Sequence, residues 1–88
     1  MVGYVAQAER AEADAAMDAA WNSFGMWSRV PAEARALSVM KLAAVMRRRR
    51  LELVAWLVLE VSKNWREADA DVAEAIDFCE FYAREAIR

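Results

Sequence analysis

Four consecutive arginines, Arg47 to Arg50, are the densest charged feature of this 88-residue sequence. Clustered guanidinium groups can contact the phosphates of nucleic acid or an anionic membrane surface. On a helix, however, successive residues point about 100° apart, so four arginines in a row do not form one basic face. Acidic segments also lie on both sides of the run, since residues 1–28 carry four acidic and one basic side chain and residues 66–88 carry seven acidic and three basic. The pattern predicts a solvated helix junction that pairs with acidic neighbours, with no nucleic-acid or membrane partner.

A group of carboxylates follows near the C-terminal end: Asp69, Asp71, Glu74 and Asp77. At helical spacing several of them lie near one another, as carboxylates do in metal sites and in general acid/base pairs. The chain has no histidine and no second motif that would complete such a site. We therefore expect ordinary acids on a polar helix face and no metal site.

Cys79 is the one side chain of a type that commonly acts as a nucleophile through a thiolate. It falls on the apolar side of a helical pattern, and no histidine is present to serve as its base. We expect a buried thiol and no catalytic residue. A single cysteine also excludes an internal disulfide and a zinc site of the usual cysteine and histidine kind.

The composition is typical of a helical globular unit, but its apolar content is high for so small a domain. It is 59% hydrophobic and 30% charged, with four tryptophans, two glycines and one proline. The tryptophans are spread over several segments, so core or interface packing is favoured over ligand stacking. Gly3 and Gly25 do not make a phosphate-binding loop. The apolar excess predicts a partner, either missing polypeptide or a second copy in a homo-oligomer.

Nothing in the sequence indicates a membrane or secreted protein. The longest apolar run, Leu53 to Leu59, is far shorter than the roughly 20 residues that span a bilayer. Met1 is not followed by the basic and apolar regions of a secretory signal. We expect a soluble, cytoplasmic chain.

Helical periodicity runs through almost the whole chain and predicts four helices, over residues 8–24, 31–47, 48–62 and 66–87. Gly25 is expected to end the first helix, and Pro31 to lie in the first turn of the second. The third is apolar nearly all round and should be central. Residues 1–5 suit either a strand remnant or a disordered end. The predicted fold is all-α, an antiparallel arrangement of about four helices forming a single unit over residues 1–88.

Two stripes of apolar residues are expected to face the core. The stripe of the second helix continues into the third and comprises Leu37, Met40, Ala44 and Leu51. The last helix places on one face Ala68, Val72, Ala75, Ile76, Cys79, Ala83 and Ala86.

Several runs resemble the aldehyde dehydrogenase superfamily, over nearly the whole chain. They are Ala11–Ala16, Phe24–Trp27, Pro31–Arg35, Met46–Arg49, Leu59–Lys63, Lys63–Trp65, Glu67–Phe78 and Phe81–Arg84. The last three are similar to the 1-pyrroline-5-carboxylate dehydrogenase branch, which oxidises glutamate γ-semialdehyde to glutamate with NAD. One departure is Ser62, which stands where the family's Glu-x-Gly-Lys motif has glycine. The backbone conformation of this turn is therefore in question, because glycine tolerates backbone angles that serine does not.

The resemblance implies that these helices are the N-terminal helices of an α/β dehydrogenase. The nucleophilic cysteine, the general base and the residues that contact NAD come later in the family's chain. Glu74 is the one residue that could inherit a role, by bordering the substrate pocket and pairing with the substrate's α-ammonium group. The alternative for Glu74 in this chain is a solvated glutamate without a binding role. We therefore expect a non-catalytic fragment or truncated relative that holds no cofactor of its own. The alternative is a self-associating helical interaction module without enzymatic role.

Overall fold

The computed structural model describes residues 3–88, which contain four helices and no strand. The helices are α1 (Arg10–Trp27), α2 (Ala32–Arg48), α3 (Arg50–Val61) and α4 (Trp65–Glu85). The predicted all-α class is confirmed, with helix bounds that differ from the expected ones by one to three residues. The chain divides into two compact units, Met1–Val30 and Pro31–Arg88. The single unit over residues 1–88 stays a prediction.

The first unit consists of an extended segment and α1. Residues 3–9 form neither helix nor strand, while residues 1–2 of the predicted strand remnant or disordered end lie outside the described part. The N-terminus of α1 is capped by a hydrogen bond in which the Glu9 N–H donates to the Glu12 carboxylate at 2.9 Å. The helix does not end at Gly25 as predicted. It continues to Trp27, and Gly25 keeps a negative φ, because a single glycine weakens a helix by only about 1 kcal/mol.

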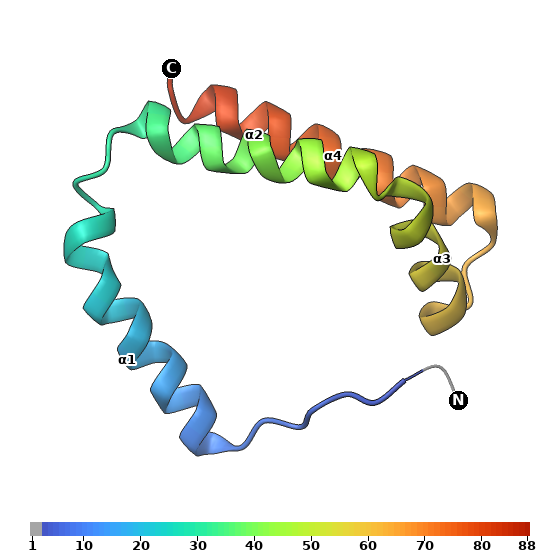
Figure 1. Cartoon of the computed structure of the whole chain (residues 1–88), viewed down its shortest axis with the longest axis horizontal. Helices are drawn as coiled ribbons and strands as arrows, with labels where there is room; N and C mark the ends of the chain where they lie inside the picture. The colour runs from blue at the N-terminus through green and yellow to red at the C-terminus, as the bar shows by residue number, and fades with distance from the viewer. Residues whose placement is uncertain (1–2) are drawn as a thin grey trace. The chain divides into compact units, whose positions relative to one another are not determined.

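The second unit is built around α4. In Figure 1, α2 and α4 lie side by side and run in opposite directions, while α3 turns away from them at one end. The core is one cluster with members from all three helices: Ala43, Val54, Ala68, Val72 and Ile76, with Met46, Leu53, Leu57, Val58 and Cys79 packed against it.

Alanines bring α2 and α4 together. Ala36 and Ala43 on α2 and Ala68 and Ala83 on α4 are each at most 2% exposed. A side chain of one methyl group lets two helix backbones approach closely, so these positions are buried completely. The predicted stripe is therefore only partly correct: Met40 and Ala44 are half-buried, whereas Leu37 on α2 and Leu51 on α3 are exposed.

The prediction that the third helix is central is also wrong. Val54 is the one fully buried residue of α3, while Leu51, Trp56, Leu59 and Val61 are exposed. An apolar surface all round a helix shows that it can be buried on every side, but in this unit α3 has neighbours on only one side.

The central helix is α4, whose predicted core face is largely confirmed. Ala68, Val72, Ile76 and Ala83 are buried, with Cys79 and Ala75 half-buried and Ala86 exposed. The helix begins at a polar cap, where the Asn64 side-chain oxygen accepts a hydrogen bond from the Glu67 N–H at 3.0 Å. The buried positions of α4 carry no acid, although its exposed side holds Phe78, Phe81 and Tyr82 besides acidic residues.

The connection between α3 and α4 depends on Ser62. It ends α3 in the left-handed conformation, with φ 57° and ψ 28°, and it is the one non-glycine residue with positive φ among residues 3–88. The serine thus adopts the backbone geometry that the glycine of the family motif would adopt without strain. This conformation costs an L-residue about 1 kcal/mol or more.

We expect Ser62→Gly to raise the free energy of unfolding of the second unit by about 0.5–1 kcal/mol, because glycine relieves the left-handed strain. Urea unfolding followed by circular dichroism measures the change. The matched control is Ser38→Gly in the interior of α2, where helical backbone makes glycine less favourable by about 0.5 kcal/mol. Two variants that change stability in the same direction would contradict the assigned geometry.

Candidate functional site

The arginine run forms the corner between α2 and α3. Arg49 lies between the two helices, with φ −99° and ψ 16°. Three of the four arginines pair with acids, as the sequence predicts: Arg47 with Glu80, Arg49 with Glu52 at 2.5 Å, and Arg50 with Asp69 at 2.7 Å. Two of these pairs join α4 to the corner, so the run positions helices.

The pair of Arg50 and Asp69 is bidentate and joins α3 to α4. Nε and Nη2 of Arg50 each donate to a different Asp69 oxygen at 2.7 Å. Hydrogen bonding to Arg50, together with its positive charge, holds the pKa of Asp69 below its ordinary value. Contacts with Arg49 and Arg47 lower the pKa of Glu52 and of Glu80 in the same way.

We expect the second unit to lose stability in acid. A carboxyl group whose pKa is lower in the folded state contributes stability above its unfolded pKa, near 4. That contribution disappears as the pH falls through the folded pKa. The melting temperature should therefore fall as the pH is lowered from about 5 to below 4, and Asp69→Asn should reduce this dependence. A melting temperature that stays constant between pH 5 and pH 3 would contradict the assigned ion pairs.

Glu74 lies on the exposed side of α4, one turn beyond Asp71. Asp71 is paired with Lys63, and this hydrogen bond is the main reason why the Lys63 pKa lies above its ordinary value. The charge of Glu74 adds a smaller effect in the same direction. No hydrogen bond or ion pair within residues 3–88 engages Glu74 itself, so its carboxylate can accept a bond from another molecule.

The other carboxylates of the predicted cluster do not act together, because their surroundings differ. Asp69 is bound to Arg50 and Asp71 to Lys63, while Asp77 is exposed. No group of three or more potential ligands that could hold a metal ion occurs in the described part of the chain.

Cys79 is half-buried and packs against the core cluster, so the predicted burial is only partial.

The burial of the tryptophans differs more from expectation. Trp21, Trp27, Trp56 and Trp65 are between 44% and 69% exposed, so core packing is not what these residues do in this structure. Their alternative role, interface packing, stays a prediction.

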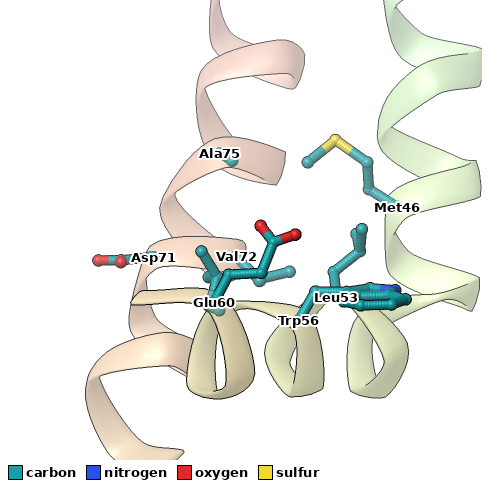
Figure 2. Close-up of a pocket in the computed structure, with 8 residues that line it drawn as sticks. Met46, Leu53, Trp56, Glu60, Asp71, Val72 and Ala75 are labelled. Carbon is teal, nitrogen blue, oxygen red and sulfur yellow. The ribbon is translucent and has the colours of Figure 1, made fainter. Parts of the chain in front are cut away.

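The second unit also contains a groove of about 340 Å³, which sequence reasoning missed. Figure 2 shows side chains of α2, α3 and α4 around it. Its apolar lining consists of Met46, Leu53, Trp56, Leu57, Val72 and Ala75, and its two polar residues are Glu60 and Asp71. Residues on α3 and α4 meet here because the chain reverses at Ser62, the position where the family motif has glycine.

Comparison with known proteins gives one consistent result. The model of the Aldehyde dehydrogenase family matches residues 1–88. The chain belongs to the aldehyde dehydrogenase family. No solved structure matches it.

Individual relatives of this aldehyde dehydrogenase chain carry the name 1-pyrroline-5-carboxylate dehydrogenase. The protein of that name from Geobacillus kaustophilus strain HTA426 is 51% identical over 88 residues, and that from Bacillus subtilis strain 168 is 47% identical over 88 residues. Both matches cover 100% of this chain and 17% of the relative. The chain thus spans about one sixth of the length of the relatives that it matches.

The residues present do not fit the NAD cofactor that the family resemblance implies. A dinucleotide site of the Rossmann kind needs a strand, a glycine-rich turn and a helix N-terminus. Residues 3–88 contain no strand, and Gly25 lies inside α1, far along the chain from Gly3.

No helix in the described part is long and apolar enough to cross a membrane.

Proposed function

We propose that this chain is the non-catalytic N-terminal helical part of a 1-pyrroline-5-carboxylate dehydrogenase. The observation that carries the proposal is the alignment of all 88 residues with relatives of that name at 47–51% identity, over only 17% of their length. The parent reaction oxidises the aldehyde of glutamate γ-semialdehyde to a carboxylate and reduces NAD. In this proposal the nucleophile, the base and the cofactor site belong to the remaining polypeptide.

The chemistry of the described residues supports a non-catalytic role. Cys79 is half-buried against apolar side chains, and no histidine is available to deprotonate it. The exposed Glu74 is proposed to border the substrate pocket of the whole enzyme, where its carboxylate binds the α-ammonium group of the substrate. Its lack of a partner within residues 3–88 suits that role.

The proposal is tested by assaying the isolated chain for NADH formation from glutamate γ-semialdehyde and NAD. We expect no rate above that of the buffer. A rate that depends on the concentration of the chain, and that survives removal of trace enzyme by repeated purification, would overturn the non-catalytic assignment.

A self-associating helical module is the second candidate, favoured by the apolar side chains of α1. No residue of α1 is buried, and Trp21, Phe24 and Met26 are 58–77% exposed. Light scattering on a size-exclusion column tests this candidate. A discrete oligomer would support it. A monomer would favour the first proposal, in which the rest of the dehydrogenase covers the exposed apolar side chains of α1.

A further inference from the structure

The groove between α2, α3 and α4 carries unbalanced negative charge. Glu60 and Asp71 are its two polar residues, and Lys63 neutralises Asp71. Glu60 has no hydrogen bond or ion pair within residues 3–88, and Figure 2 shows its carboxylate directed into the space between α4 and α2, whereas that of Asp71 points away. The groove therefore presents one unpaired carboxylate above an apolar surface.

The end of α3 strengthens this charge. Glu60 lies in the last turn of α3, a turn without any basic residue. The C-terminus of a helix carries partial negative charge, so an acidic residue there is unfavourable until a cation approaches. Trp56, which is 44% exposed, adds an aromatic side chain to the same groove. Indole faces attract ammonium and guanidinium groups.

We infer that this groove receives an apolar side chain next to a lysine or arginine, supplied by the part of the dehydrogenase polypeptide outside this chain. The apolar side chain contacts Met46, Leu53 and Val72, while the cation pairs with Glu60. The inference rests on the proposed function. That source is favoured because the chain spans only 17% of its relatives' length and the groove, of about 340 Å³, is at the small end of ligand pockets.

Charge reversal at Glu60 separates docking from a role inside the unit. The substitution is Glu60→Lys, made in the isolated chain and in a chimera in which these 88 residues replace the matching segment of the Bacillus subtilis relative. In the isolated chain the melting temperature should stay unchanged or rise, because lysine suits a helix C-terminus. In the chimera it should fall by about 2–4 °C.

A second variant, Ala75→Trp, tests the apolar half of the groove. Ala75 is half-buried at the groove wall, so a large side chain there fills the open space of the isolated chain. In the chimera the same side chain competes with the docking residue, and the melting temperature should again fall by about 2–4 °C.

Several results would overturn the inference. Equal shifts in chain and chimera would place the effect of Glu60 inside the unit, and no shift in the chimera would show that nothing basic docks. An oligomer of the isolated chain that Glu60→Lys dissociates would identify a second copy as the occupant. An unfolded, inactive chimera with an unaltered groove would reject the proposed function itself, whereas an active chimera insensitive to both variants would reject only the groove.

Discussion

Val54→Asp should abolish the cooperative unfolding of the second unit and most of its helical circular dichroism. Val54 is 1% exposed and lies in the core cluster beside Ala43, Ala68 and Val72. A carboxylate at this position would be buried without a partner, at a cost of several kcal/mol. A unit of this size has a total stability of about 3–9 kcal/mol, so one such change removes most or all of it.

The matched control for this change is Leu51→Asp. Leu51 lies on the same helix and is also a large apolar residue, but it is 78% exposed. Aspartate there should change the free energy of unfolding by no more than about 0.5 kcal/mol. If Leu51→Asp unfolded the unit and Val54→Asp did not, the face of α3 assigned to the core would be incorrect.

Glu74→Ala in the chimera should lower kcat/KM for glutamate γ-semialdehyde by about 10- to 100-fold. The expected size follows from the loss of one hydrogen bond to a charged group, about 1.5–3 kcal/mol. The reason is that Glu74 is exposed, has no partner within residues 3–88, and is proposed to bind the substrate's ammonium group. Steady-state rates at varied aldehyde concentration measure the change.

Two controls give this experiment its meaning. Asp77→Ala removes another exposed carboxylate from the same helix and should leave kcat/KM within about twofold. An aldehyde of similar length that lacks the ammonium group should be oxidised equally by the chimera and its Glu74→Ala variant. Equal losses for both aldehydes would contradict a role in ammonium binding and indicate a structural effect.

The sequence predicts the fold best where polar and apolar residues segregate. The α4 face containing Ala68, Val72 and Ile76 is predicted correctly because every acid of the helix falls outside it. The position of α3 is not predictable from its pattern, since a uniformly apolar helix does not say which side has a neighbour. The contact face of α2 was predicted only in part because Ala36 and Ala43 are less hydrophobic than the leucines beside them, although their small size is what allows close packing.

The candidate site divides in the same way. That the arginines pair with acids follows from charge balance, but their partners, such as Glu80 for Arg47, depend on the antiparallel packing of α2 and α4. The groove at Glu60 requires residues of three helices and the left-handed turn at Ser62, so no periodicity reveals it. Glu74 owes its proposed role to family resemblance, because spacing alone describes only an exposed acid.

The most direct test of the account is NADH formation by the chimera, compared with the isolated chain and with the Bacillus subtilis enzyme lacking its matching segment. We expect the chimera to oxidise glutamate γ-semialdehyde at a rate within about tenfold of the relative, and the two separate pieces to be inactive when assayed alone. A chimera that folds, as judged by circular dichroism, yet shows no activity would contradict the claim that these helices serve as the N-terminal part of such a dehydrogenase.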